Sequence, residues 1–427
     1  MRIAIIGGGI TGLSLANLLK EKKEVFLFEA DEIGGKIKTQ YYLYNNKNYF
    51  IELGPDSVIF EEQKIKKIEE FFPNIFDNKN FAKNNPIYIF DGNSIKLLPA
   101  NFSEFLKTSL LTFDEKFLVF VDFLLELFKL RNYDLNITLR EYCDQRISKS
   151  FCKKVLEPLF SNIFGLSSDK LIVKFIYPLI KKSFWRYKPV RMFNSKFGMK
   201  KWIEKLSNKI KIVKNKIVNI REFEGKFSLK GIDGKEFDNF NKIVITGQAY
   251  NIIEIMKNID FGSYLQEANN LKNQIIYLLS KISFHSSFID IFILKNFVNL
   301  KANGVIFKSF DFIKSLTFFS KKWYDDYDVE IIRVFGNTEN FEDIIKDTKK
   351  FFSFLSYDFE SNILDHFKVK WERALVDYDK DFLENYEKLR KTCKEFEKFG
   401  IYIFASFLGG SNITDRIIFS IDNHEIL

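Results

Sequence analysis

The spacing of apolar residues at the start of the chain predicts a βαβ unit. Residues 2–6, RIAII, form a short apolar run typical of a buried parallel strand. Residues 13–22, LSLANLLKEK, place apolar side chains at helical spacing, and residues 24–30, EVFLFEA, form a second buried run. A strand, a helix and a second strand in this order favour a parallel sheet.

Further along the chain the pattern changes several times. Residues 86–99 predict a hairpin that turns at Asp91-Gly92-Asn93, and residues 101–185 follow helical spacing. Alternation returns over 210–246, where two segments with glycine turns indicate a small antiparallel meander, and strand-rich segments recur over 275–335. A charged helix over 379–398 precedes a final strand, a glycine loop and a short helix. Without repeats or a low-complexity linker, this order predicts an α/β fold whose domains are interleaved.

Three glycines directly after the first predicted strand point to a phosphate-binding turn. In Gly7-x-Gly9-x-x-Gly12, Gly7 permits a tight turn, Gly9 lets the backbone approach a pyrophosphate, and Gly12 lets the helix pack on the strand. The free N–H groups at the helix start favour an anion. Glu29 ends the second strand, where its carboxylate can accept hydrogen bonds from the hydroxyls of a ribose. The loop therefore predicts a dinucleotide.

A second pair of glycines narrows the choice of dinucleotide. Residues 31–39, DEIGGKIKT, place Gly34 and Gly35 just beyond the acidic residue, with Lys36 next to them. A nicotinamide fold does not require this pair. We expect it where a longer cofactor continues past the pyrophosphate and the backbone stays close to it.

The composition and charge of the chain indicate which binding partners and sites to expect. The chain has 427 residues and a formal net charge of +9, but its basic residues are spread evenly, so we expect a solvated surface and no nucleic acid. The 3 Cys and 3 His show no metal-ligand spacing, and we expect no metal, no disulfide and a reducing, cytoplasmic compartment. No signal peptide and no apolar run long enough to span a bilayer are expected.

Several motifs together resemble the FAD-binding proteins of the flavin amine-oxidase superfamily, and the protoporphyrinogen oxidases in particular. The motifs follow in order from residue 3 to residue 420. They are GGGITG, EA and GGKIKT near the start, then IELGPDS at 51–57, EPLFSNIFG at 157–165, FGMKKWI at 197–203, KWERA at 370–374 and GIYIFASFLGGSNITD at 400–415.

The resemblance implies a role for individual residues. The pyrophosphate would meet Gly7, Gly8, Gly9, Ile10, Thr11 and Gly12. The adenosine ribose would meet Glu29 and Ala30, the phosphate side Gly35 and Lys36, and the adenine the backbone of Ile217. The flavin would be lined by Gly54, Pro55, Asp56, Ser57, Trp371, Asn412, Ile413 and Thr414. No catalytic residue is named, because the flavin itself carries the redox step.

The resemblance also implies the domain organisation. A Rossmann-like FAD-binding domain would comprise 1–85, 195–255 and 398–427, and a mixed-sheet substrate domain 86–100 and 256–397. A helical subdomain over 101–194 would touch the inner face of a membrane through an amphipathic surface. Core packing is the other explanation of its apolar stripes.

The implied activity is the oxidation of protoporphyrinogen IX, a tetrapyrrole, with dioxygen or a respiratory carrier as the electron acceptor. Coproporphyrinogen is the alternative substrate. Glu61 and Glu62 stand where the family often has a basic residue for a propionate, which puts the substrate in doubt. Another oxidoreductase of the superfamily, acting on an amine or a polyene, and a non-catalytic FAD-binding relative stay open as well. The oligomeric state is not predicted.

Overall fold

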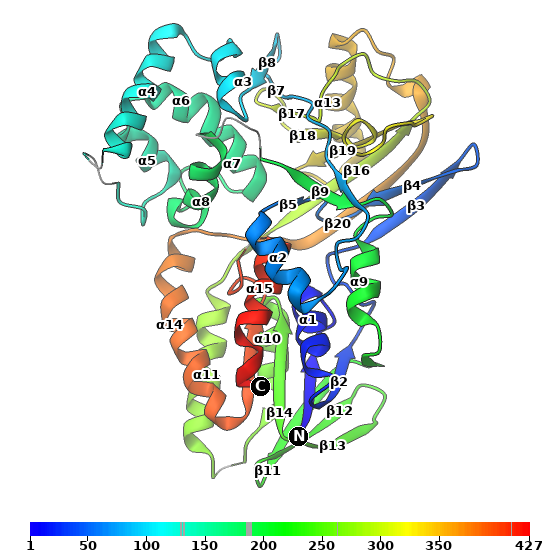
Figure 1. Cartoon of the computed structure of the whole chain (residues 1–427), viewed down its shortest axis with the longest axis vertical. Coiled ribbons are helices and arrows are strands. Elements are labelled where there is room, and N and C mark those ends of the chain that lie inside the picture. The colour runs from blue at the N-terminus through cyan, green and yellow to red at the C-terminus, as the bar shows by residue number, and fades with distance from the viewer. Residues whose placement is uncertain (129, 131–132, 185–189, 263, 411) are drawn as a thin grey trace.

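The computed structural model describes residues 1–128, 130, 133–184, 190–262, 264–410 and 412–427. Two bodies lie one above the other in the view of Figure 1, with both termini in the lower one. The lower body contains a parallel sheet with helices on its faces, and the upper body contains a larger sheet beside a group of helices. The chain passes between the two bodies several times, so neither body is built from one continuous segment.

The lower body is built on a five-stranded parallel sheet of strand order β10-β2-β1-β14-β21. The strands are β1 (Arg2–Ile6), β2 (Glu24–Glu29), β10 (Lys211–Lys214), β14 (Lys242–Gly247) and β21 (Ile401–Ala405). Alternate residues of β1 face opposite sides: Ile3 and Ile5 join one core, and Ala4 and Ile6 join another. Since both faces are buried, the strands are continuous apolar runs, as the sequence pattern predicts.

Helices and a meander cover the two faces of this sheet. One face carries α1 (Ile10–Leu19), α9 (Lys200–Ser207) and α15 (Ile413–Asn423). The other carries α10 (Ala249–Lys257), α11 (Gln266–Ser280), α14 (Lys380–Phe396) and the strands β11 (Ile217–Phe223), β12 (Lys226–Gly231), β13 (Glu236–Phe240) and β15 (Ile259–Asp260). Here the structure differs from the predicted domain bounds, because α11 and α14 pack together beside α10. Their apolar faces complete the core under the parallel sheet.

The upper body is built on a seven-stranded mixed sheet of order β20-β16-β19-β18-β17-β7-β8. Its strands are β7 (Ile87–Phe90), β8 (Ile95–Leu98), β16 (Phe284–Leu294), β17 (Gly304–Phe307), β18 (Ile313–Phe318), β19 (Glu330–Gly336) and β20 (Ile363–Val376). Strands β17 and β7 run parallel and the other neighbours antiparallel. The helix α13 (Phe341–Phe354) covers one face, and α12 (Phe319–Trp323) follows β18.

The helical group beside this sheet spans the segment predicted to be helical. It contains α3 (Phe102–Lys107), α4 (Phe113–Leu127), α5 (Leu139–Gln145), α6 (Lys149–Phe151), the π-helix η1 (Cys152–Leu156), α7 (Glu157–Phe164) and α8 (Val173–Phe184). Side chains of Asn101, Thr112 and Thr138 cap three of the helix starts. None of the helices in the described residues is long and apolar enough to cross a membrane.

Cys143 and Cys152 form a disulfide between α5 and η1, with their Cα atoms 5.3 Å apart. The prediction of no disulfide is wrong here. A spacing of nine residues matches no common motif, and only the packing of α5 against η1 brings the two thiols together. Both side chains are fully buried in the core of the helical group.

Two small sheets and one helix connect the bodies. The hairpin of β3 (Thr39–Tyr44) and β4 (Lys47–Glu52) forms one sheet, and β5 (Val58–Ile59), β6 (Lys79–Phe81) and β9 (Met192–Ser195) form the other. The helix α2 (Glu62–Phe71) lies between β5 and β6 in sequence, and the 3₁₀ turns η2 (Glu360–Asn362), η3 (Glu397–Phe399) and η4 (His424–Ile426) complete the structure. The segment 52–57 leads out of β4 at this junction.

Candidate functional site

The glycine loop has the tight geometry that its spacing predicts. Gly7 has a φ of +110°, which favours glycine, and its N–H donates to the carbonyl oxygen of Phe28 at 2.8 Å. A Cβ on Gly12 would lie 2.0 Å from the carbonyl oxygen of Gly7, so only glycine lets the helix approach the strand this closely. The helix α1 begins at Ile10, and Ile10 and Thr11 are buried behind the loop.

Glu29 is held at the end of β2 by two backbone donors. The N–H of Gly8 donates to its Oε2 at 2.6 Å, and the N–H of Asp31 donates to its Oε1 at 2.9 Å. A carboxylate can accept further hydrogen bonds at both oxygens, so this orientation leaves acceptor sites for ribose hydroxyls. Ala30 follows on the surface.

The second glycine pair lies directly against the first. The N–H of Gly34 donates to the carbonyl oxygen of Gly8 at 2.8 Å, and Gly35 has a φ of +60° with its Cβ position 3.5 Å from the Cα of Gly9. A Cβ on Gly9 would meet no atom within 4 Å. The open space over this glycine and the exposed backbone around it fit a pyrophosphate.

Lys36 turns toward the upper body. Its Nζ donates to the carbonyl oxygens of Arg373 and Ala374 in β20, at 2.8 and 2.5 Å. Burial, and then the nearby guanidinium of Arg416, lower the pKa of Lys36 to about 8. The structure therefore gives Lys36 carbonyl partners in β20 where the resemblance implied a phosphate.

Glu52 ends β4 as a fully buried carboxyl group with three hydrogen-bond donors. The side chains of Thr39 and Asn194 and the N–H of Met199 donate to it at 2.8, 3.0 and 2.7 Å. Burial raises the pKa of Glu52 to about 7 in spite of these donors. Thr39, Glu52 and Met199 belong to three of the motifs named above, so the hydrogen bonds of Glu52 connect these motifs.

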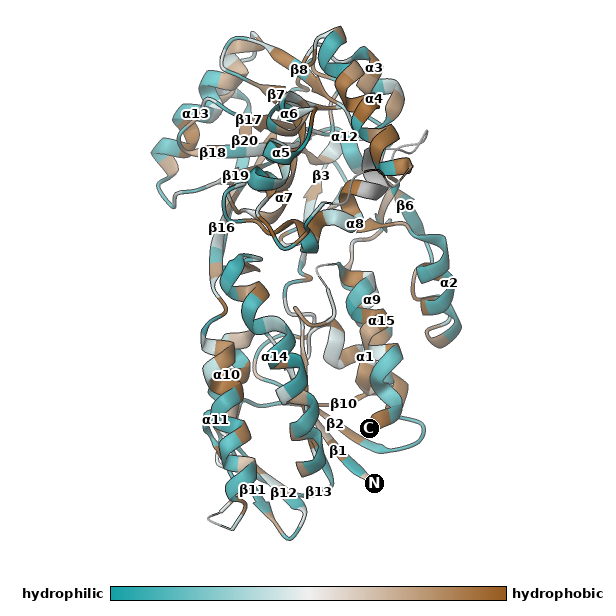
Figure 2. Ribbon diagram, turned by 90° about the vertical axis from the view of Figure 1, so that its left-hand side faces the viewer, coloured by the Kyte–Doolittle hydropathy of each residue, from teal (hydrophilic) through white to brown (hydrophobic). Residues whose placement is uncertain are grey.

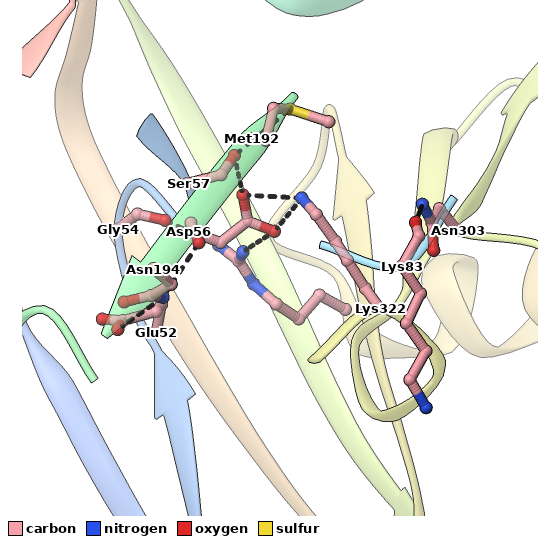
Figure 3. A network of polar contacts seen from close by, with 10 residues as sticks. Glu52, Gly54, Asp56, Ser57, Lys83, Met192, Asn194, Asn303 and Lys322 are labelled. Carbon is pink, nitrogen blue, oxygen red and sulfur yellow. Dashed lines mark hydrogen bonds and ion pairs between the residues drawn. The ribbon is translucent and has the colours of Figure 1, made fainter. Parts of the chain in front are cut away.

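The loop Gly54–Ser57 follows Glu52, and the side chain of Asp56 points to the upper body (Figure 3). The ammonium of Lys322 donates to both oxygens of Asp56, and the guanidinium of Arg333 lies 3.4 Å away. The hydroxyl of Ser57 also donates to Asp56, at 2.8 Å. That Asp56 and Ser57 line the flavin remains a prediction. The Asp56 carboxylate has partners within the protein, namely Lys322, Arg333 and Ser57. Pro55 is exposed at the outside of the loop.

Trp371 meets this loop from β20. Its indole N–H donates to the carbonyl oxygen of Leu53 at 2.9 Å, and its Cζ2 lies 3.8 Å from the Cβ position of Gly54. The structure thus brings together the loop and the tryptophan, which lie more than 300 residues apart in the chain.

The carboxyl-end edge of the parallel sheet carries buried polar atoms that lack hydrogen-bond partners among the described residues. They are Oε1 of Gln248, Oγ of Ser406 and Oγ1 of Thr414. Gln248 and Ser406 follow β14 and β21, and Thr414 lies in the first turn of α15 behind Asn412 and Ile413. Ligands of open α/β sheets bind at this edge, and unpaired buried polar atoms there fit a polar cofactor.

The adenine side of the site lies beside Glu29. The N–H of Asn215 donates to the carbonyl oxygen of Glu29 at 2.9 Å, which places the start of β11 next to the end of β2. Ile217, predicted to meet adenine through its backbone, is the first residue of β11 and is buried.

Three side chains of this site were not predicted: Lys322, Arg333 and Asn194. Each lies more than 130 residues from the segment that it contacts, so no local motif contains the pair. One signal was present in the sequence, because Arg333 interrupts the apolar strand Ile331-Ile332-Arg333-Val334. An arginine in a buried strand usually has a specific partner.

Comparison with known proteins agrees with this geometry. The model of the NAD(P)-binding Rossmann-like domain family matches residues 5–66. Coproporphyrinogen III oxidases of Staphylococcus aureus and Bacillus subtilis are each 28% identical over 191 residues, which cover 42% and 41% of this chain and 40% and 39% of theirs. The chain thus spans about two fifths of the length of these curated relatives.

Solved structures extend the similarity to the whole fold. A protein of Exiguobacterium sp. 255-15, provisionally described as a protoporphyrinogen oxidase, covers 99% of this chain and 98% of its own, with a TM-score of 0.76 and 19% identity. The predicted resemblance to the porphyrinogen oxidases is confirmed by the two curated relatives, and this structure shows the same fold. A reduced UDP-galactopyranose mutase has a TM-score of 0.71 at 13% identity and covers 99% of this chain and 93% of its own. The α/β fold with its Rossmann-like domain is confirmed as well. The match to a dinucleotide-binding domain supports a dinucleotide cofactor, the class to which the predicted FAD belongs.

Proposed function

We propose that this chain is an FAD-dependent oxidoreductase that oxidises a porphyrinogen, with protoporphyrinogen IX as the substrate. The observation that carries the proposal is the open space over Gly9, with Glu29 oriented beside it and unpaired polar atoms along the sheet edge. The similarity to the porphyrinogen oxidases supports the choice of substrate class.

FAD bound here would supply a ring that accepts a hydride from the substrate. The protein binds and orients the cofactor. The backbone N–H groups at the start of α1 would hold the pyrophosphate, Glu29 the ribose, and the backbone of Gly54 with Trp371 would border the flavin. Because the hydride goes to the cofactor, the reaction requires no nucleophile from the protein.

One cavity of the upper body is a candidate substrate site under this proposal. A cavity of about 570 Å³ lies between the β7–β8 hairpin and the helical group. Apolar side chains and three lysines line it together, and among them are Leu110, Leu111, Lys96, Lys154 and Lys308. Carboxylates already engage Lys96 and Lys154. This supply of cations favours protoporphyrinogen over coproporphyrinogen, which carries more propionates.

The names of the curated relatives favour coproporphyrinogen III as the second candidate substrate. Two further candidates are another oxidoreductase of the flavin amine-oxidase superfamily and a flavoprotein without turnover. The residues that depart from the family's motifs at 61–62, 376–382 and 411–416 motivate the last one. Glu61 forms an ion pair with Lys64, and Lys64 also pairs with Asp415, so this segment holds α2 on α15.

We also propose that the helical group contacts the inner, cytoplasmic face of a membrane. In α4, the side chains at 113, 117, 120 and 127 form one exposed apolar stripe, and residues 102 and 106 of α3 extend it. Figure 2 shows hydrophobic residues on α3 and α4 at one end of the molecule. The stripe would deliver an apolar substrate, and dioxygen or a respiratory carrier would receive the electrons.

Purified protein tests the proposal directly. We expect a yellow protein, or a colourless one that turns yellow with FAD, whose flavin absorbance is bleached by protoporphyrinogen IX without oxygen. Coproporphyrinogen III is compared in the same assay, and faster bleaching by it would reverse the choice of substrate. A chain that takes up no FAD would contradict every flavin function, and a yellow chain that neither porphyrinogen bleaches would favour the last two candidates.

A further inference from the structure

Two cations from the upper body hold the loop Gly54–Ser57. The ammonium of Lys322 donates to the two carboxylate oxygens of Asp56 at 3.0 and 2.9 Å (Figure 3), and the guanidinium of Arg333 lies 3.4 Å from the same carboxylate. Lys322 lies in the helix α12 and Arg333 in β19, so both belong to the upper body. The loop itself follows β4, the second strand of the β3–β4 hairpin.

Arg333 makes a second contact with the same loop. Its NH2 group donates to the carbonyl oxygen of Gly54 at 2.7 Å. The side chain is 2% exposed, and the rings of Phe319 and Phe335 lie 5.9 and 5.1 Å from its guanidinium carbon. A guanidinium packed this closely between rings has little freedom, so it fixes the loop carbonyl in one position.

The carbonyl group of Asp56 in the loop and that of Leu53 just before it are held as well. The side chain of Asn194 donates to the carbonyl oxygen of Asp56 at 2.9 Å, and the indole of Trp371 donates to that of Leu53 at 2.9 Å. The loop backbone is therefore bound from β9, β19 and β20 together. A surface turn that only connected two bodies would not need this number of buried donors.

Asp56 is the carboxylate that both buried cations contact. The side chains of Asp56, Lys322 and Arg333 are 14%, 9% and 2% exposed, so each cation depends on Asp56 for a counter-charge. Burial alone would raise the pKa of Asp56, but Lys322 and Arg333 outweigh it and hold this pKa below its usual range. Loss of one partner from such a cluster leaves a buried charge unpaired, which is strongly unfavourable.

We propose that Lys322 and Arg333 are positioning residues for the cofactor, which hold the loop Gly54–Ser57 through Asp56 in the conformation that FAD meets. This inference rests on the proposed function, because it requires that FAD binds. FAD affinity then depends on residues of the upper body.

The test compares Lys322→Met with Lys83→Met in the full-length protein. Lys83 is a nearby lysine whose ammonium points away from Asp56 (Figure 3), so its loss removes the same charge without touching the loop. The dissociation constant for FAD is measured by quenching of flavin fluorescence. We expect a rise of about tenfold or more for Lys322→Met, no change for Lys83→Met, and substantial recovery for Lys322→Arg.

The position of the flavin absorption bands gives a second readout, because a displaced loop changes the surroundings of the ring. Asp56→Asn serves where Lys322→Met fails to fold, and the same loss of affinity is expected for it. A folded Lys322→Met or Asp56→Asn protein that binds FAD as tightly as the unaltered chain overturns the inference. Failure of the unaltered chain to bind FAD would instead overturn the proposed function.

Discussion

Glu52 is a buried carboxyl group whose protonation should make the stability of the protein depend on pH. Burial raises its pKa from 4.5 to about 7. Between these values the folded protein keeps a proton that the unfolded chain releases, so the free energy of unfolding falls as pH rises. The difference is on the order of 3 kcal/mol for a group this deeply buried.

Glu52→Gln should therefore flatten the pH dependence. We expect the variant to lose stability more slowly than the unaltered chain between about pH 4.5 and pH 7, because its amide cannot ionise. Urea unfolding at several pH values measures this. Parallel stability curves for the two proteins would contradict the assignment of this pH dependence to Glu52.

A substitution at Gly9 should weaken FAD binding without affecting folding. Its φ of −72° suits any residue, and a Cβ there would meet no protein atom within 4 Å. We expect Gly9→Ala to fold with nearly unchanged stability but to bind FAD at least about tenfold more weakly, because the methyl group would occupy the space of the pyrophosphate. Fluorescence titration and thermal unfolding measure the two quantities. Normal FAD affinity in this variant would place the pyrophosphate elsewhere.

Local motifs were predictable from the sequence because the residues that act together lie close together in the chain. The glycine loop and Glu29 fall within 23 residues, and the structure places them in direct contact. The partners of Asp56 could not be found in this way, since Lys322 and Arg333 lie more than 260 residues away. The sequence around Ser57 gave no sign that cations from α12 and β19 would contact this loop.

Several phenylalanine side chains of α4 are exposed at the surface. Phe113, Phe117 and Phe120 are 83%, 58% and 49% exposed. We expect the triple Ser variant to bind vesicles of phosphatidylglycerol and phosphatidylcholine at least about tenfold more weakly than the unaltered chain, because each buried phenyl ring contributes roughly 1.5–3 kcal/mol. Co-sedimentation with vesicles measures the binding.

The matched control lies at the other end of the molecule. Phe223 and Ile232 are exposed to a similar extent, at 66% and 68%, beside the β11–β12 hairpin. Their double Ser variant should bind vesicles as the unaltered chain does. Equal loss in both variants, or no loss in the α4 variant, would mean that α4 is not the membrane-contacting element.

The disulfide between α5 and η1 should stabilise the helical group. A cross-link restricts the unfolded chain, so we expect Cys143→Ser/Cys152→Ser to lower the free energy of unfolding by about 2–4 kcal/mol. Reductant should lower the stability of the unaltered chain similarly and leave the double variant unchanged. Urea unfolding with and without dithiothreitol measures this, and a response of the double variant to reductant would point to a different cause.

Strands and helices were predictable from periodicity, whereas the sheet order was not. The hairpin 86–99 and the helix 379–398 both appear close to their predicted bounds. The placement of α11 and α14 under the parallel sheet depends on which apolar faces meet, and periodicity does not contain that information. The predicted domain bounds near 256 and 397 therefore differ from the packing.

At the scale of the whole molecule, cofactor binding should stabilise the fold in a selective manner. FAD at about a hundred times its dissociation constant is expected to add about 2.7 kcal/mol to the free energy of unfolding. NAD should stabilise the protein less. The close approach of Gly34 and Gly35 to the first glycine loop is expected for a cofactor that continues past the pyrophosphate, and a nicotinamide cofactor does not require it. Thermal unfolding with each ligand measures this, and an equal response to both would contradict the assignment of FAD.

The strand order of the parallel sheet has a consequence for synthesis of the protein. The central strand β1 is synthesised almost 400 residues before β21, which completes its sheet, and the hydroxyl of Ser420 in α15 donates back to the carbonyl oxygen of Thr11. Contacts this far apart in the chain slow folding and leave apolar strands exposed on the nascent chain. The nascent protein should therefore depend on chaperones until β21 and α15 are available to complete the sheet.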